Sequence, residues 1–142
     1  MSKSNAFETS LLNLIFNATA MTGVAENHSS SPITSLYVSL HTSDPGETGT
    51  QATNEIAYTS YARVAVVRTS SGWTISGNSV SPAAAIDFPA GTGGSGTATH
   101  MGIGTLTSGA GVLLYSGAIS PTIVTGNGIT PSLTTATAIT ED

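Results

Sequence analysis

Short segments in which apolar and polar residues alternate, separated by turn-forming residues, occupy most of the chain beyond residue 34. Within residues 35–41, Leu36, Val38 and Leu40 alternate with more polar neighbours, which is the period of a strand with one buried face. Further strands are predicted over residues 61–68, 73–76, 84–88, 97–103, 111–119, 122–125 and 134–140. Seven to nine short strands joined by turns are typical of sandwiches, so we expect a mainly β fold: a jelly-roll-like β-sandwich with one N-terminal α-helix.

One helix is predicted ahead of the strands. Asn5, followed three residues later by Glu8, has the spacing of a capping box. Apolar residues then recur at helical spacing, in a stripe made of Phe7, Leu11, Leu14 and Ile15 and widened by Leu12 and Phe16. Gly23 and the polar run over residues 26–32 should end this helix. We expect a single domain over residues 1–142, with a helix segment over 1–22 and the β-sandwich over 33–142.

Charged residues are scarce, and this scarcity excludes several classes of function. Only 8% of the 142 residues are charged, with a net charge of -5, and the basic residues are Lys3, Arg63 and Arg68. A nucleic-acid binder needs clustered cations to neutralise phosphates, and an anionic membrane surface selects for the same residues. The chain has no cysteine, which excludes disulfides, thiolate metal sites and a cysteine nucleophile. We expect synthesis in a cytoplasm, with neither nucleic acid nor membrane as partner.

Hydroxyl side chains supply the polarity that charges do not. The chain contains 20 serines and 23 threonines, and 39% of its residues are hydrophobic, which argues for a folded chain over a disordered one. A protein that diffuses alone usually keeps more surface charge for solubility. This composition therefore predicts that other subunits cover much of the surface.

Asp44-Pro45-Gly46 predicts a tight turn after the first strand, because proline sets φ at the second position and glycine allows a positive φ at the third. A long exposed loop should follow, up to about residue 54. The carboxylates of Asp44, Glu47 and Glu55 gather in this region, but their spacing is not that of a calcium-binding loop. We interpret them as a solvated acidic loop.

No motif for catalysis or for a cofactor is convincing. Residues 91–96 match the letters of a dinucleotide-binding loop, yet a strand is predicted after them where the motif requires a helix. His28, His41 and His100 lack the spacing of metal ligands, and none of the serines lies in a nucleophile elbow. We predict no enzyme activity, no catalytic residue, no cofactor and no metal.

The two arginines near the centre of the chain and the aromatic residues suggest contacts of other kinds. Arg63 and Arg68 are an odd number of residues apart, so a regular strand would point them to opposite faces, each pairing with a carboxylate such as Glu55 or Asp87 or with an acidic residue of a partner chain. A platform for stacking sugars is an alternative use of the aromatic residues, namely Tyr37, Tyr58, Tyr61, Trp73 and Tyr115.

One stretch resembles small virion proteins of tailed bacteriophages, which are often labelled tail-fibre-like and are similar to the cement, or decoration, proteins of phage heads. The stretch reads L-x-V-S-L-H-T-x-D-P-G-x-x-G over residues 36–49, then N-E at 54–55 and Y-x-x-Y-x-R-V over 58–64. The run L-Y-x-G-A-I over 114–119 fits the same layout. The chain departs from the family's usual Gly-Asp turn before the last strand, where it has Gly126-Asn127-Gly128.

The resemblance implies a structural virion protein on the capsid exterior, a cement protein that bridges neighbouring capsomers. Its partners would be further copies of itself, as a dimer or trimer, and the major capsid protein. The alternative is a tail-fibre or receptor-binding module that recognises host glycan. The candidate subunit contacts are Phe7, Leu11, Leu14, Ile15, Asp44, Pro45, Glu47, Arg63 and Arg68.

Overall fold

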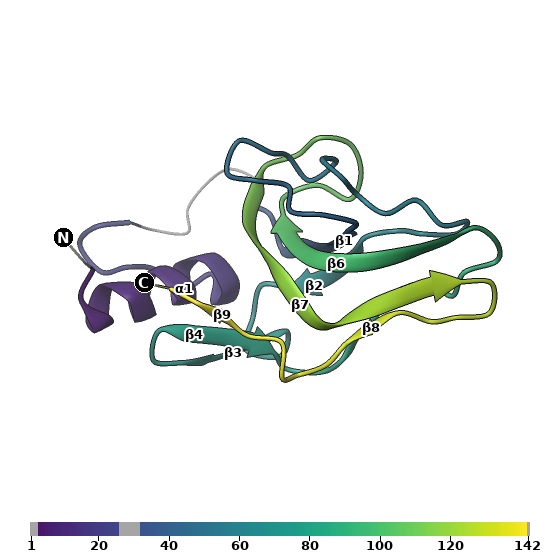
Figure 1. Ribbon diagram of the computed structural model, residues 1–142. Helices are drawn as coiled ribbons and strands as arrows, with labels where there is room; N and C mark the ends of the chain where they lie inside the picture. The colour runs from purple at the N-terminus through teal and green to yellow at the C-terminus, as the bar shows by residue number, and fades with distance from the viewer. Residues whose placement is uncertain (1–2, 26–31, 142) are drawn as a thin grey trace. The chain divides into compact units, whose positions relative to one another are not determined.

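A computed structural model describes residues 3–25 and 32–141 of the chain (Figure 1). The chain divides into two compact units, which are described separately below. The first comprises the described residues of Met1–Ser35, Val66–Ala85 and Thr134–Asp142, and the second comprises Leu36–Ala65 and Ile86–Leu133.

The first unit contains the helix α1 (Asn5–Asn17) and a three-stranded sheet. The sheet has the order β3-β4-β9 and is formed by β3 (Trp73–Ser76), β4 (Ser79–Pro82) and β9 (Ile139–Thr140). The predicted strand over 73–76 is confirmed. β4 was not predicted, because the run Ser-Val-Ser-Pro carries little apolar signal; a two-residue turn with Gly77 at φ 61° pairs it with β3.

The helix begins and ends at other residues than predicted. Its N-cap is Ser4, whose side chain accepts a hydrogen bond from the Phe7 amide, and not Asn5. It ends at Asn17, where the next residue, Ala18, takes a left-handed conformation with φ 52°, well before Gly23. Most of the predicted run 26–32 lies outside the described residues.

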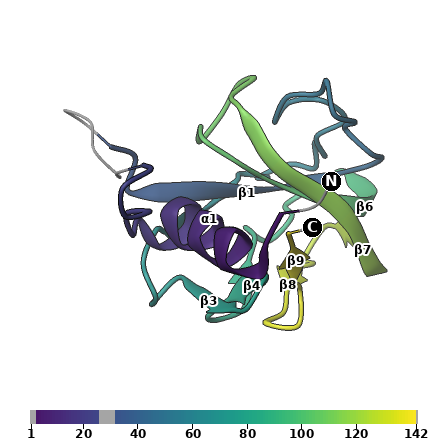
Figure 2. The same cartoon turned by 90° about the vertical axis from the view of Figure 1, so that its left-hand side faces the viewer.

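The buried stripe of α1 also differs from the predicted one. The structure buries Glu8, Leu12 and Phe16, which lie four residues apart, whereas Phe7 is 42% exposed. Figure 2 shows α1 alongside β3 and β4. Phe16 meets Trp73 edge to face there, with ring centroids 4.9 Å apart. The helix therefore packs on its own hairpin through these two aromatic rings.

The second unit is built on a four-stranded sheet of order β2-β1-β6-β7. Its strands are β1 (Ser35–His41), β6 (Ser95–Gly104), β7 (Leu113–Gly126) and the start of β2 (Val64–Val67), which continues into the first unit. β5 (Ile86–Asp87) pairs with β8 (Ser132–Leu133) in a small second sheet. The strand predicted over 35–41 is confirmed, but its end is buried on both faces, since Ser39 and His41 are as inaccessible as Leu40.

β7 is a single strand where a break was predicted at the Ser-Pro pair 120–121. It pairs with β6 along its length, as the two long arrows in Figure 1 show. The register shifts opposite Thr99, so the four residues 119–122 lie between two paired positions. Pro121 has no N–H to donate. It is tolerated in this bulge because β7 is an edge strand, with a neighbouring strand on one side only.

The mainly β fold is confirmed, with nine strands and one helix in the described part of the chain. These antiparallel sheets are compatible with a β-sandwich, while the jelly-roll order stays a prediction. The glycine-rich stretch 91–96 leads into β6 and not into a helix, as expected. None of the described helical residues forms a segment long and apolar enough to span a membrane.

Candidate functional site

The most elaborate polar arrangement lies in the second unit, where Arg63 holds a surface loop. Its guanidinium donates to both carboxylate oxygens of Glu55, with Nε–Oε1 and Nη2–Oε2 each 2.7 Å, and its side chain is only 2% exposed. The remaining donors reach the carbonyls of Leu106, at 2.8 Å, and Gly109, at 2.7 Å. The hydrogen bonds to Glu55 raise the pKa of Arg63. A buried cation thus fixes two carbonyls of the loop over residues 105–112.

Tyr61 ties this ion pair to the sheet. Its hydroxyl donates to Glu55 Oε1 at 2.8 Å and accepts from the backbone amide of Leu40 in β1 at 3.1 Å. Burial raises the pKa of Tyr61, so the hydroxyl stays protonated and keeps donating. The predicted pairing of Arg63 with Glu55 is confirmed. Arg63 lies before β2, however, and not within a regular strand.

Gln51 holds the same loop from inside and is completely buried. Its side-chain oxygen accepts from the Leu106 amide at 2.9 Å, and its backbone amide donates to the carbonyl of Ala110 at 2.8 Å. Its side chain lies directly against Gly104 and Gly111, at both ends of the loop. The loop predicted to be exposed up to residue 54 therefore contains a core residue, and the loop 105–112 is held from two sides.

Ser39 and His41 form a buried pair whose side chains could be mistaken for catalytic groups. His41 Nδ1 lies 2.8 Å from the carbonyl of Thr53, which can only accept, so Nδ1 carries the proton and Nε2 accepts from the Ser39 hydroxyl at 2.8 Å. Burial lowers the pKa of His41 and keeps the ring neutral. Both side chains have no exposed surface, so no substrate reaches the serine. The pair satisfies polar groups in the core.

The loop and the neighbouring strand expose apolar side chains. Leu106 is 48% exposed and Val112 60%, and on β7 Leu114 and Val124 are 37% and 60% exposed. We call these four residues, together with the unpaired side of β7, the apolar edge. β7 spans 14 residues without a charge, and it is the last strand of its sheet, so within the described residues no strand pairs with its outer side. Proteins normally protect such an edge with lysine, a short strand or a covering segment.

The predicted subunit contacts fall into two groups. Phe7, Asp44 and Glu47 are exposed, and Leu11, Leu14 and Ile15 are partly exposed. Pro45, Arg63 and Arg68 are buried within their own units. Arg68 donates to the carbonyls of Leu14, Ile15 and Ile33, and burial lowers its pKa. The predicted turn is present: the Gly46 amide binds Asp44 Oδ1 at 2.9 Å, and Gly46 has φ 73°.

The aromatic residues do not form an exposed platform for stacking sugars. Trp73 and Tyr58 are buried, with 1% and 3% exposure. The rings pack on one another: Tyr58 meets Tyr61 at 5.4 Å between centroids, and Tyr61 stacks on Phe88 at 6.3 Å. Tyr37 and Tyr115 remain partly exposed.

The predicted metal-ligand candidates do not come together within the described part of the chain. Residues 3–25 and 32–141 contain no group of three or more His, Asp or Glu that could hold a metal ion. His28 lies outside the described residues.

A family model described as "Podophage GP4 fiber I protein gp80" matches residues 2–139. The chain belongs to this family. No curated protein matches the chain significantly. A member of the podophage fiber I family is a structural protein of the bacteriophage virion, as the resemblance implied. The family description names a fiber and does not name a capsid cement protein.

The sequence predicted the pairing of Arg63 with Glu55, but it did not predict the contacts of Gln51 or the free edge of β7. Gln51 gave no signal, because a lone glutamine between threonine and alanine looks like a loop residue. The break predicted at Pro121 divided β7 into two short strands, so a long free edge was not predicted. Its absence of charge over 14 residues was the available signal.

Proposed function

We propose that the chain is a structural subunit of a phage fiber, which associates with further copies of itself through the apolar edge. The observation that carries this proposal is the uncharged 14-residue edge strand β7. A second strand added to it would satisfy the outward N–H and C=O groups along the strand. The family description supports the fiber as the location, in place of the capsid exterior.

The clamped loop supports the same proposal. Arg63 and Gln51 hold the backbone that carries Leu106, while the side chain of Leu106 stays 48% exposed. A loop that is already fixed loses little conformational entropy when it is covered. Leu114 and Val124, near the two ends of β7, also expose apolar side chains. The buried polar contacts of Arg63 and Gln51 therefore hold the loop in a conformation that exposes Leu106 to a partner.

The oligomeric state tests the proposal. Val124→Lys places a charge on the apolar edge, whereas Val24→Lys, at a valine that is 76% exposed and outside every strand, is the matched control. Analytical ultracentrifugation should show an oligomer for the unmodified chain and for Val24→Lys, and a shift towards monomer for Val124→Lys. A monomeric unmodified chain, or an unchanged oligomer in Val124→Lys, would contradict the proposal.

Electron cryomicroscopy of whole virions tests the location. Density for the chain in a fiber supports the proposal. Density for it at many positions on the head would instead favour a cement protein with the major capsid protein as partner, and would overturn the fiber assignment.

A further inference from the structure

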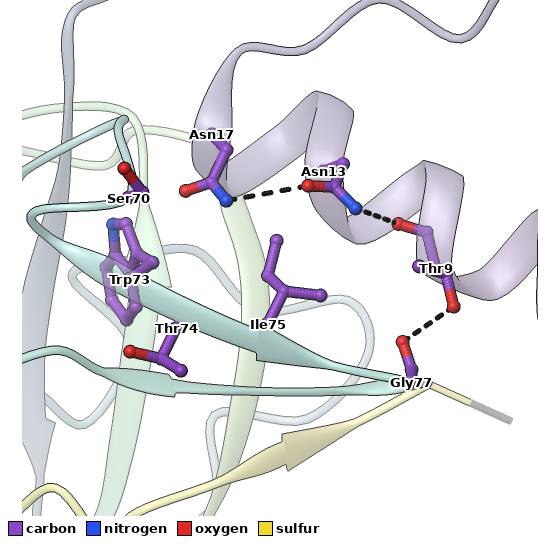
Figure 3. A pocket seen from close by; sticks show the side chains of 8 residues that line it. All are labelled: Thr9, Asn13, Asn17, Ser70, Trp73, Thr74, Ile75 and Gly77. Carbon is purple, nitrogen blue, oxygen red and sulfur yellow. Dashed lines mark hydrogen bonds between the residues drawn. The ribbon is translucent and has the colours of Figure 1, made fainter.

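The first unit contains a pocket of about 320 Å³ between one face of α1 and the β3–β4 hairpin (Figure 3). Thr9, Asn13 and Asn17, four residues apart, come from the helix. Trp73 and Ile75 come from β3. None of the lining residues is charged. The size is at the lower end of ligand pockets, which span about 300–1,000 Å³, so it suits a ligand of one ring.

Two buried polar atoms of residues that line this pocket have no hydrogen-bond partner among the described residues. They are the indole nitrogen Nε1 of Trp73, a residue that is 1% exposed, and the side-chain oxygen of Asn17. Leaving a buried polar atom unsatisfied costs about 1–3 kcal/mol, and folded proteins keep few such atoms. Figure 3 shows the nitrogen and the oxygen turned towards the same end of the pocket, beside Ser70.

The two atoms are complementary to a hydroxyl group. Trp73 Nε1–H can only donate and Asn17 Oδ1 can only accept, and one hydroxyl can accept from the first while it donates to the second. Thr9 and Ser70 add further hydroxyls, and Ile75 adds an apolar surface. A ring that carries several neighbouring hydroxyls and has an apolar face matches this lining.

The Asn17 side chain is held less firmly than its neighbour Asn13 on the same face of the helix. Neither atom is reached by solvent in this conformation. The Asn17 amide is held only by a long hydrogen bond, 3.5 Å from its Nδ2 to Asn13 Oδ1, whereas Asn13 itself is anchored to the Thr9 carbonyl at 2.9 Å. Binding of a ligand to the two atoms therefore requires a side-chain movement, and rotation of the Asn17 side chain breaks this one long hydrogen bond.

We propose that this pocket binds one neutral sugar ring, with a ring hydroxyl bridging Trp73 Nε1 and Asn17 Oδ1. The indole ring itself stays in the core against Phe16 and offers the ligand only its N–H edge, in contrast to an exposed stacking platform. The absence of charge in the lining selects against acidic sugars. This site lies in the first unit and is independent of self-association through β7 in the second.

The single tryptophan makes the test direct, because a ¹⁵N-labelled chain gives one indole N–H signal in its NMR spectrum. The methyl glycosides of glucose, galactose, mannose and N-acetylglucosamine are titrated separately into the millimolar range, with N-acetylneuraminic acid as the charged comparison. We expect a saturable shift of the indole signal with at least one neutral sugar and none with the acid. Absence of a saturable shift with every neutral sugar would overturn the proposal.

Variants distinguish the pocket from other sites. Asn17→Leu removes the acceptor and Ser70→Ala removes a lining hydroxyl, while Thr107→Val changes an exposed threonine in the second unit. We expect binding about tenfold weaker in Asn17→Leu, as for loss of one hydrogen bond, and unchanged binding in Thr107→Val. Unchanged affinity in both pocket variants would overturn the proposal. Circular dichroism shows whether each variant folds. If Asn17→Leu does not fold, the sugar affinity of Ser70→Ala tests the proposal.

The same spectra separate two sources of the sugar. A methyl glycoside has a blocked anomeric position, as has a residue at the end of a surface glycan. Binding of methyl glycosides and of oligosaccharides that end in the same ring identifies a glycan end as the ligand. Binding of the methyl glycoside but not of such oligosaccharides identifies a free small sugar, and either result supports the pocket.

Discussion

Arg63 binds both carboxylate oxygens of Glu55, at 2.7 Å each, while its side chain is only 2% exposed. The same guanidinium holds the carbonyls of Leu106 and Gly109. An ion pair in the core of the second unit therefore determines the course of a surface loop. This loop exposes Leu106 and Val112. The polar contacts of Arg63 therefore fix the backbone of part of the proposed assembly surface.

Removal of the Glu55 carboxylate should lower the free energy of unfolding strongly. Glu55→Gln leaves Arg63 as a buried cation without its counter-ion, and breaking such a pair costs about 3 kcal/mol or more. The measurement is urea unfolding of both proteins. Glu47→Gln, at an exposed carboxylate, serves as the control and should change the free energy of unfolding by less than about 0.5 kcal/mol. Equal effects of the two variants would show that the ion pair does not stabilise the fold.

Stability should fall when the pH drops below the ordinary histidine pKa of 6.5. Burial lowers the pKa of His41 in the folded chain, so below 6.5 the unfolded chain binds more protons than the folded one. The contribution is complete above 6.5 and is lost as the pH falls towards the folded pKa. Burial has the largest effect on the pKa of this ring; the hydrogen bond to the Thr53 carbonyl and the charge of Glu55 oppose it, whereas Arg63 and His100 lower the pKa further.

The slope of the unfolding free energy against pH checks this prediction. His41→Gln lacks the titrating ring, so its stability should vary less between neutral and mildly acidic pH, whatever its absolute value. An identical slope in both proteins would assign the acid sensitivity to another group.

Gly104→Ala should reveal how tightly Gln51 fills the core. A Cβ at Gly104 would run into the Gln51 side chain, and overpacking of this kind costs about 1–3 kcal/mol. In a Gln51→Ala background the added methyl group has space, so the cost of Gly104→Ala should shrink. A double-mutant cycle measures the difference. Additive effects of the two substitutions would mean that the close contact is relieved elsewhere.

Arg68→Met should loosen the C-terminal turn of α1. Arg68 donates to the carbonyls of Leu14 and Ile15, and the last turn of the helix contains no basic residue of its own. Loss of these bonds leaves carbonyls at the negative end of the helix unsatisfied, at a cost of roughly 2–3 kcal/mol. Hydrogen exchange should accelerate at amides of this turn. Lys3→Met, which removes a partly exposed cation, should leave this exchange rate unchanged.

Local patterns predicted the elements that depend on neighbouring residues. The alternation from Leu36 to His41 located β1, and the sequence after Gly72 located β3. The Asp-Pro-Gly turn also depends on a few adjacent residues, and it is present. The helix was predicted in the right place, although its cap was wrong. Of the predicted stripe, Leu12 and Phe16 are buried and Phe7 is exposed, because the hairpin on which the helix packs selects the buried face.

The sequence by itself determined a mainly β chain with few charges, no thiol chemistry and strands separated by turns, because strand periodicity and turn residues act over short distances. Only the tertiary structure decided that β7 runs unbroken through Pro121 as a free edge. It also decided that Gln51, Ser39 and His41 are buried. Partners far along the chain satisfy their polar groups, and no local pattern shows which distant donor or acceptor will be present.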